Sequence, residues 1–394
     1  MNFDDVIESV RKPFASATSL SPEVFTSPKW FDFEKEHILY KHWNFVGLQQ
    51  NVPGIGDYFV TELYGESIII IRDHDKRLHA FLNVCRHRCS KVLSDSGSCR
   101  VIRCPFHAWT YRLDGSLKRA TDFPDMPEHQ KRELGLKELR CESWQGLIFV
   151  TFSQDTPSID EMLSDLSEDF HNYPLEEMHC VRERKDEVRV NWKLYNDIDT
   201  DPGHGPVHSS TIGAQEYELS SSKRYYRTLF MPSNNSSALL PKDYGNGFDH
   251  IPNLPGRAKN GTLYLQFFPA LYVILTQDCA WWLNKTPVDH QTTILRVGYM
   301  FPKETVQRDD FEEVVKTYFQ RWDQVVEEDN WIMEQQQLGM SSAFSSSGPL
   351  SEQDRYVWDL HNWYVDRVQE AKEGIICTDR SVTSSINGRI KTVG

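Results

Sequence analysis

Residues 85–107, CRHRCSKVLSDSGSCRVIRCPFH, decide how this chain is organised. They contain a Cys-x-His pair at Cys85 and His87 and a Cys-x-x-His pair at Cys104 and His107, with sixteen residues between the two pairs. Two short loops can therefore bring two thiolates and two imidazoles to one metal centre.

Two kinds of metal centre use these ligand types. Cysteine thiolates hold iron-sulfur clusters, and in the Rieske variant two histidines replace two cysteines on one of the two irons. Structural zinc sites also combine Cys and His, but their motifs usually contain Cys-x-x-Cys pairs. The Cys-x-His and Cys-Pro-x-His arrangement therefore favours a Rieske [2Fe-2S] cluster. Cys89 and Cys99 flank the loop and stay open as competing ligands or as a disulfide pair.

Length and composition exclude several classes of protein. A chain of 394 residues is long enough for two domains. With 57 acidic and 43 basic residues the net charge is -14, which argues against nucleic acid as a partner. The acidic N-terminus and the lack of a run of about eighteen apolar residues predict a soluble cytoplasmic protein without a membrane span. Eight cysteines in so long a chain do not indicate a disulfide scaffold.

The patterns along the chain predict three segments. Residues 1–44 form a helical segment that packs on the catalytic domain, because Phe33, His37, Tyr40 and Trp43 recur at helical spacing. Residues 45–155 form a β domain around the Cys/His motif, and residues 156–394 form a second domain. Strand signals occur at residues 58–63, 67–73, 78–84, 101–104, 109–113, 147–152, 263–268, 271–276, 280–283 and 292–301. Residues 209–258 have little periodicity and are rich in Ser, Asn, Pro and Gly, which predicts an irregular lid over a site.

A long helix is predicted over residues 308–337. Its apolar stripe advances by alternating steps of four and three residues and then reaches Asp329. A carboxylate on a buried stripe is costly unless it is paired or binds a metal. A salt bridge at the helix end is the competing explanation for Asp329.

A second metal site is predicted near residues 191–208, NWKLYNDIDTDPGHGPVH. Two histidines and one carboxylate form the facial triad that holds mononuclear Fe(II) and leaves positions open for dioxygen and substrate. His204, His208 and Asp329 are the candidates. A lone His-x-x-x-His pair is more often structural, but the cluster motif in the same chain favours the iron site.

The chain resembles the catalytic alpha subunit of Rieske non-haem iron oxygenases, the ring-hydroxylating dioxygenase and choline monooxygenase-like family. The resemblance extends over nearly the whole length and is carried by the following stretches: residues 21–43, PGIGDYF at 53–59, the 85–107 motif with Trp109, NWK at 191–193 and EDNWIME at 328–334. It implies an α+β fold, in which an all-β Rieske domain precedes a catalytic domain with a curved antiparallel sheet flanked by helices.

The resemblance also implies roles for single residues. The implied roles are Cys85 and Cys104 on one cluster iron, His87 and His107 on the other, and His204, His208 and Asp329 on the mononuclear iron. Asp201 matches the family's aspartate that bridges to the cluster of a neighbouring subunit. Asp197 and Asp199 are the other acids that could take this bridging role. The alternative role for Asp201 is that of a helix cap.

Some positions depart from the family pattern. Cys89 and Ala108 stand where family members commonly have glycine. The iron histidines are separated by three residues rather than four, and the segment between Lys193 and Asp201 is one residue short.

The resemblance implies a Rieske-type oxygenase that uses O2 and external electrons to hydroxylate a small organic substrate, of aromatic type. The alternatives are a monooxygenase or N-demethylase of a quaternary ammonium compound such as choline or a betaine, and an electron carrier without oxygenase chemistry. Because the chain lacks a G-x-G-x-x-G motif after a strand, its electrons are expected from NAD(P)H through a separate reductase, with or without a ferredoxin. A homotrimer with head-to-tail contacts is expected. The candidate pocket aromatics are Tyr264, Phe267, Phe268, Tyr272, Trp281 and Trp282, of which the two tryptophans must point to opposite faces of a strand.

Overall fold

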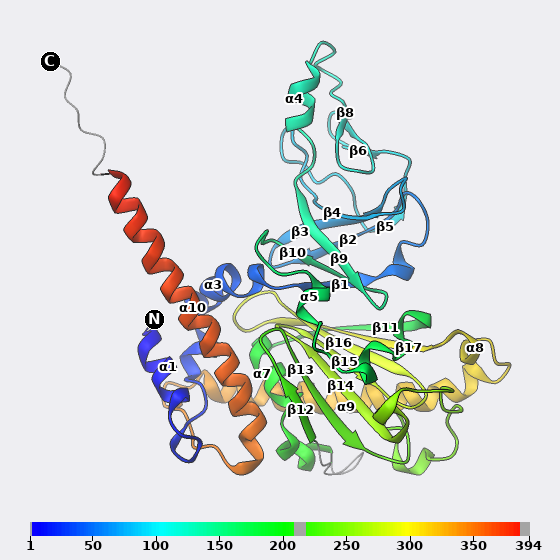
Figure 1. Ribbon diagram of the computed structural model, residues 1–394, viewed down its shortest axis with the longest axis vertical. Coiled ribbons are helices and arrows are strands. Elements are labelled where there is room, and N and C mark those ends of the chain that lie inside the picture. The colour runs from blue at the N-terminus through cyan, green and yellow to red at the C-terminus, as the bar shows by residue number, and fades with distance from the viewer. Residues whose placement is uncertain (1, 209–217, 387–394) are drawn as a thin grey trace.

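The computed structural model describes residues 2–208 and 218–386, and its strands form three antiparallel sheets (Figure 1). The first sheet has the order β1-β10-β9-β4-β3-β2-β5 and contains β1 (Asn44–Leu48), β2 (Asp57–Leu63), β3 (Glu66–Arg72), β4 (Leu78–Leu82), β5 (Ser96–Ser98), β9 (Glu138–Trp144) and β10 (Leu147–Thr151). A small sheet beside it contains β6 (Ile102–Arg103), β7 (Thr110–Tyr111) and β8 (Leu117–Arg119).

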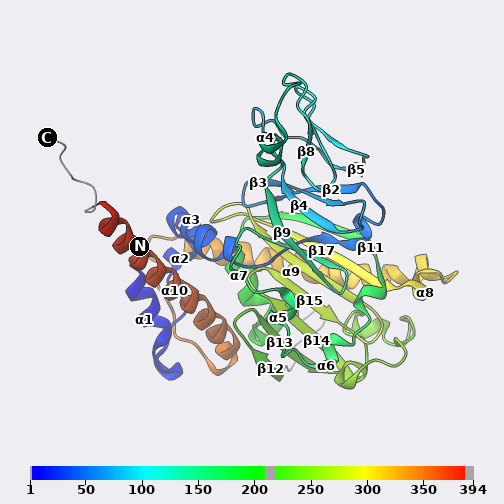
Figure 2. The ribbon, with the colours of Figure 1, turned by 45° about the horizontal axis from the view of Figure 1, so that its top comes forward.

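The third sheet forms the centre of the second half of the chain. Its order is β11-β17-β16-β15-β14-β13-β12, and it contains β11 (Met178–Val188), β12 (Glu218–Ser222), β13 (Tyr226–Pro232), β14 (Gly261–Phe267), β15 (Leu271–Leu275), β16 (Ala280–Pro287) and β17 (Thr293–Pro302). Figure 2 shows that the first sheet lies above this sheet, while α9 runs along the other side of it.

The helices gather mainly around the third sheet. They are α1 (Phe3–Arg11), α2 (Pro22–Thr26), α3 (Pro28–His37), α4 (Glu128–Glu133), α5 (Ile159–Met162), α6 (Glu168–His171), α7 (Trp192–Ile198), α8 (Lys303–Val306), α9 (Phe311–Met340) and α10 (Arg355–Ile386). The N-terminal α1 packs against the C-terminal α10. Within the described residues, no helix is both long enough and apolar enough to cross a bilayer.

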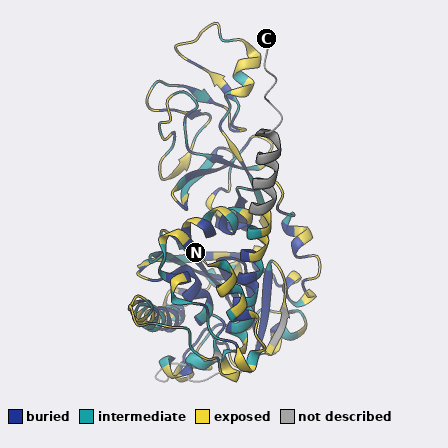
Figure 3. Ribbon diagram, turned by 90° about the vertical axis from the view of Figure 1, so that its left-hand side faces the viewer, coloured by how far each residue is buried: buried dark blue, intermediate teal, exposed yellow. Residues whose placement is uncertain are grey.

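The third sheet has a core on each face because successive side chains of a strand point to opposite sides. Trp281 lies against Trp322 of α9, whereas its neighbour Trp282 packs on Phe45 of β1 with ring centroids 4.8 Å apart. One face therefore contacts the first sheet and the other contacts the helices. Figure 3 shows these inner layers as buried and the loop and helix α4 at the top of the view as largely exposed.

The predicted α+β architecture is confirmed, with differences in detail. The long helix begins at Phe311 rather than residue 308 and ends at Met340 rather than residue 337. The first predicted helix is shorter than its pattern, since α3 ends at His37 and a 3-10 turn, η2 (Leu39–Lys41), follows. Both differences lie at element ends, where local signals are weakest.

The prediction that residues 209–258 are irregular is partly wrong. Residues 209–217 lie outside the described residues, but β12 and β13 follow them, and β13 is buried along nearly its whole length. A strand that is buried on both faces shows no polar and apolar alternation, so periodicity could not identify it. The long strand β11 was also missed, because its charged MHCVRERKDEV sequence belongs to a sheet edge.

A buried ion pair joins three distant segments of the chain. Glu34 of α3 is fully buried and accepts hydrogen bonds from Lys193 Nζ (2.7 Å to Oε1) and Trp192 Nε1 (3.0 Å), both on α7. The hydroxyl of Tyr364 on α10 donates to the same carboxylate. Burial lowers the pKa of Lys193, and the charge of Glu34 opposes that shift. Glu34 thus connects the N-terminal segment, the start of the second domain and the C-terminal helix.

Removing either charge of this pair should destabilise the fold. We expect Glu34→Gln and Lys193→Met each to lower the free energy of unfolding by about 3–5 kcal/mol, because the remaining group is left in a buried site without its partner. The double variant should lose less than the sum of the single losses. Urea unfolding followed by circular dichroism measures this.

The exposed ion pair between Lys223 and Asp165 is the matched control. Lys223→Met should cost less than about 1 kcal/mol because water screens an exposed pair. If the double variant loses as much free energy of unfolding as the two single variants together, Glu34 and Lys193 do not stabilise the fold through their interaction.

Candidate metal centres

The predicted cluster ligands lie on two loops at the end of the first domain. Cys85 follows β4, and Cys104 lies between β6 and β7. Both cysteines are buried, and the imidazoles of His87 and His107 lie with ring centroids 4.8 Å apart. The two loops thus bring the two imidazoles together, and the buried thiols of Cys85 and Cys104 are close enough to interact with each other.

The two loops have the same local backbone. The N–H of Cys89 donates to the carbonyl of Cys85 (3.0 Å), and the N–H of Ala108 donates to the carbonyl of Cys104 (3.1 Å). Cys89 has φ 57° and Ala108 has φ 59°, in the left-handed region that glycine adopts most easily. The non-glycine residues cost roughly 1–2 kcal/mol each there, which explains why glycine suits both positions. Cys89 and Cys99 are free thiols, so the disulfide alternative is wrong.

The surroundings of these loops fit an iron-sulfur cluster. Trp109 stacks on His87 with an interplanar angle of 2° and orients that ring. The Nδ1 atom of His87 is buried and has no hydrogen-bond partner among the described residues, as expected of an atom reserved for a metal. The Tyr111 hydroxyl lies 3.3 Å from Cys85 Sγ. Hydrogen bonds to cluster sulfurs tune the reduction potential, so Tyr111 is a residue of interest that the motif alone did not reveal.

The predicted iron ligands converge in the second domain. His204 and His208 lie on a 3-10 turn, η5 (Pro202–His208), and Asp329 lies on α9. One potential ligand atom from each residue lies within 4.8 Å of the others. Since α9 contacts both α7 and η5, the tertiary fold brings the distant carboxylate to the two imidazoles.

The distances at this site suit one metal ion. The Nε2 atoms of His204 and His208 are 3.1 Å apart, and Asp329 Oδ1 lies 3.1 Å from His208 Nε2. Two nitrogen donors that bind one ion at about 2.1 Å and at a right angle lie roughly 3 Å apart. The three side chains therefore fit the facial triad.

The other nitrogen of each histidine is held by the protein. His204 Nδ1 donates to the carbonyl of Asp201, and His208 Nδ1 donates to Glu328 Oε2 (2.7 Å). Such contacts fix the ring orientation and the tautomer, so that Nε2 keeps its lone pair for the metal. Glu328 was not predicted, although it precedes Asp329 directly in the EDNWIME stretch.

Two of the competing acids are engaged by bases. Asp197 lies 3.2 Å from His361 Nε2 of α10, so it orients that histidine rather than a predicted iron ligand. Asp199 pairs with the fully buried Lys285 of β16. Burial raises the pKa of Asp199 to about 6, and Lys285 opposes that shift. Both acids have structural partners.

Asp201 has a different environment. Its carboxylate accepts a hydrogen bond from the N–H of Gly203 (2.6 Å), and burial raises its pKa. It lines a cavity of about 270 Å³ together with His204 and Gln336. Asp201 therefore lies beside a predicted iron ligand, His204, and lines the same cavity.

The sequence models of two protein families match the chain. The family "Ring hydroxylating alpha subunit (catalytic domain)" matches residues 175–370, and the family "Rieske [2Fe-2S] domain" matches residues 42–132. The second match contains both cluster loops, and the first contains the predicted iron ligands. Together they imply a Rieske cluster and a mononuclear iron in this architecture.

Three known proteins illustrate the similarity. The glycine betaine monooxygenase oxygenase subunit of Pseudomonas aeruginosa is 24% identical, with 93% of this chain and 95% of the relative covered. A quaternary ammonium Rieske monooxygenase solved with L-carnitine superposes with a TM-score of 0.74 at 22% identity, over 93% of this chain and 98% of that one. Naphthalene 1,2-dioxygenase from Rhodococcus sp. superposes with a TM-score of 0.72 at 17% identity, covering 93% and 97% of the two chains.

Glu328 should control metal retention at the second centre. We expect Glu328→Gln to weaken iron binding at His204, His208 and Asp329 by about 10–100-fold, because His208 loses its charged partner. Iron analysis after dialysis against a graded chelator measures this, and the visible absorption of the cluster serves as the internal reference.

The adjacent Glu327 provides the matched control. It is largely exposed and lies 3.4 Å from Arg184, so Glu327→Gln should leave both metal contents unchanged. Equal iron loss in the two variants would show that Glu328 has no special role.

Proposed function

We propose that this chain, which belongs to the Rieske non-haem iron oxygenases, hydroxylates a small quaternary ammonium compound. The observation that carries the proposal is the convergence of His204, His208 and Asp329 in a fold that also holds a cluster motif. The full-length similarity to a glycine betaine monooxygenase supports this substrate class over a purely apolar aromatic one.

The sheet face near the proposed iron site supports a polar substrate. Tyr264 and Tyr272 stack on this face with ring centroids 5.7 Å apart. Gln266 lies opposite Tyr272 on the neighbouring strand, Arg227 lies opposite Gln266 on the next strand, and both Gln266 and Arg227 are fully buried. Neither side-chain polar atom of Gln266 has a hydrogen-bond partner among the described residues. A face with such groups suits a charged molecule better than an unsubstituted hydrocarbon ring.

This face carries aromatic rings that suit the quaternary ammonium group of a betaine and a guanidinium group that suits its carboxylate. Aromatic ring faces attract quaternary ammonium groups by about 0.5–2 kcal/mol per contact. Arg227 donates through Nη2 to Asp359, while its Nε and Nη1 atoms have no partner among the described residues. Guanidinium groups bind carboxylates well. We therefore favour a zwitterionic substrate, with aromatic-ring dihydroxylation as the second candidate because the fold also superposes on naphthalene 1,2-dioxygenase.

The proposed reaction inserts one oxygen atom of O2 into a C–H bond and reduces the other to water, which consumes two electrons and two protons. When bound, the iron supplies dioxygen activation and the cluster supplies single electrons. His204, His208 and Asp329 would hold the iron on one side, and Glu328 keeps His208 oriented. Electrons from NAD(P)H would arrive through a separate reductase, with or without a ferredoxin.

A head-to-tail homotrimer is part of the proposal. Figure 1 places β6 and β8, which flank the proposed cluster loops, at the opposite end of the molecule from α7 and α9. The predicted cluster and iron sites of one chain are thus separated by the first and third sheets. Large exposed apolar side chains occur at both ends, at Phe106 and Phe123 near the cluster and at Trp331 and Leu338 on α9. Such residues suit contacts between subunits, and Asp201 would bridge to His107 of a neighbour.

The substrate class can be tested by oxygen uptake. The purified protein with a surrogate reductase and NADH should consume oxygen with glycine betaine, carnitine or choline, and mass spectrometry should detect a hydroxylated or demethylated product. Benzoate and naphthalene should give no product. His204→Ala, which lacks one proposed iron ligand, should be inactive with every compound while it keeps the cluster spectrum. Turnover of an aromatic compound alone would favour aromatic-ring dihydroxylation. An unchanged iron content in His204→Ala would refute the proposed oxygenase site.

The bridging role of Asp201 is tested by Asp201→Asn. We expect both metal contents to stay unchanged and turnover to fall roughly 10–100-fold, because a charge-assisted hydrogen bond to the neighbouring cluster ligand is lost. Single-turnover measurements on the prereduced protein report the transfer step directly. Asp197→Asn is the matched control, and a loss of turnover in that variant alone would identify Asp197 as the bridging acid.

A further inference from the structure

Positive charge is concentrated around the proposed cluster loops, in a chain that is acidic overall. Residues 85–137 contain eleven Lys or Arg residues and six Asp or Glu residues. The remainder of the chain contains 32 basic and 51 acidic residues, so the segment has a charge of +5 and the remainder a charge of -19. A basic surface on an acidic protein steers partners of opposite charge to one place.

The small sheet presents this charge on its outer face. Arg103 of β6 lies opposite Thr110 of β7. A bulge in β8 sets Lys118 and Arg119 together opposite the same threonine. All three basic residues are exposed, and none of them forms an ion pair with another described residue. We call Arg103, Lys118 and Arg119 the basic face.

The other face of the small sheet reaches the predicted cysteine ligands. Its side chains are buried and belong to Ile102, Tyr111 and Leu117. The hydroxyl of Tyr111 lies 3.3 Å from Cys85 Sγ, and Cys104 directly follows β6. A single layer of sheet therefore separates the basic face from both predicted thiolate ligands.

The predicted histidine ligands have different neighbours. His87 contacts Phe123 and His107 contacts Phe106, and both phenylalanines are exposed. These apolar residues belong to the proposed contact between subunits, in which Asp201 of a neighbour would meet His107. The basic face contains none of the residues proposed for that contact, so it is left for another partner.

Nearby carboxylates do not neutralise the basic face. The helix α4 packs beside β8 and carries as many cations as carboxylates. The other nearby acids in the sequence are Asp114, Asp122 and Asp125, and the segment keeps its positive charge when they are counted. Charges more than about 10 Å away are largely screened at 0.1 M salt. The basic face therefore attracts an acidic surface locally, although the whole chain has a net charge of -14.

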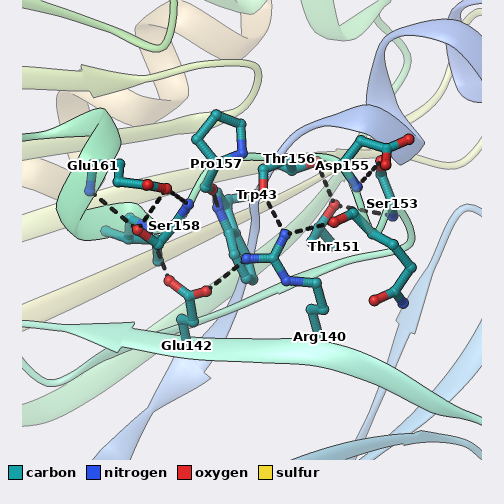
Figure 4. A network of polar contacts seen from close by, with 12 residues as sticks. Trp43, Arg140, Glu142, Thr151, Ser153, Asp155, Thr156, Pro157, Ser158 and Glu161 are labelled. Carbon is teal, nitrogen blue, oxygen red and sulfur yellow. Dashed lines mark hydrogen bonds and ion pairs between the residues drawn. The ribbon is translucent and has the colours of Figure 1, made fainter.

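The basic face is held at a fixed orientation, because the junction between the two domains is tightly bonded (Figure 4). Arg140 of β9 donates to the carbonyl of Thr156, and Trp43 Nε1 donates to the carbonyl of Pro157 (2.8 Å). Thr156 Oγ1 donates to the carbonyl of Lys41 (2.9 Å). A partner would therefore meet a preorganised surface, which lowers the ordering cost of binding.

We propose that an acidic one-electron carrier protein docks on the basic face to reduce the cluster. The inference rests on the proposed function, which requires a Rieske cluster and external electrons. The carrier would lose one electron, and one of the two ferric ions of the oxidised [2Fe-2S] cluster would become ferrous, while no bond forms or breaks. Electrons would enter on the thiolate side of the cluster and leave on the histidine side, towards Asp201 of a neighbour.

The test is isothermal titration of the purified holoprotein with an oxidised plant-type [2Fe-2S] ferredoxin, used as an acidic one-electron carrier. The affinity should fall about tenfold between about 20 mM and about 200 mM NaCl, because salt screens the opposite charges. The double variant Arg103→Gln, Arg119→Gln should bind about tenfold more weakly at the lower salt concentration. Undetectable binding, or binding that does not depend on salt, would overturn the proposal.

Lys91→Gln is the matched control, since Lys91 is an exposed cation of the same segment that is already paired with Glu62 (2.7 Å). This variant should keep the wild-type affinity for ferredoxin. An equal loss in Lys91→Gln would show that net charge, rather than the basic face, governs binding. A smaller assembly in the double variant by sedimentation, with unchanged ferredoxin affinity, would show that the basic face contacts a second copy of the chain instead.

Stopped-flow reduction of the cluster, followed by its visible absorption, provides a second measurement. Reduced anthraquinone disulfonate is an anion, and its reaction should be slowed by salt and by the double variant. Reduced methyl viologen is a cation, and its reaction should be accelerated by both. Neither measurement needs substrate or the mononuclear iron, so His204→Ala should behave as the wild type does. Normal substrate oxidation without ferredoxin binding would overturn this inference and leave the proposed function intact.

Discussion

The buried contact between Glu34 and Lys193 is the constraint on which the second half of the structure depends. Lys193 and Trp192 both bind Glu34, while Asn191 caps α7 by accepting from the N–H of Lys193 (3.0 Å). The N–H of Asn191 also donates to Gln337 Oε1 of α9 (2.8 Å). The three-residue NWK motif therefore fixes α7 relative to α3, α9 and α10. Because α7 leads into η5, this junction sets the position of the proposed iron ligands His204 and His208.

The two proposed metal centres are assembled in different ways. The cluster loops are local structures with the same backbone turn, and their four ligands lie within 23 residues, from Cys85 to His107. The iron site combines a 3-10 turn with a carboxylate on a helix more than one hundred residues later. Local loops tolerate changes such as Ala108 at a glycine position, because the cost stays within one turn. The iron site depends instead on how α7, η5 and α9 pack.

The third sheet lies between the proposed iron-sulfur cluster and the proposed mononuclear iron site. One face packs on β1 of the first domain through Trp282, and the other carries Tyr264 and Tyr272 towards the helices that hold the proposed iron ligands. The chain's two proposed redox sites thus lie on opposite sides of a packed layer. This arrangement gives a structural reason to propose that electrons pass between subunits.

Much of the site was predictable from sequence because its chemistry resides in short motifs. Cys85, His87, Cys104 and His107 are recognisable by spacing, and Asp329 stands out as a carboxylate on an apolar stripe. Only the tertiary structure decided that Asp329 meets His204 and His208, since spacing cannot measure distances between separate elements. It alone revealed Glu328 on His208, the buried strand β13, and the partners of Asp197 and Asp199. Those contacts arise from packing between distant segments, and a linear pattern records only neighbours along the chain.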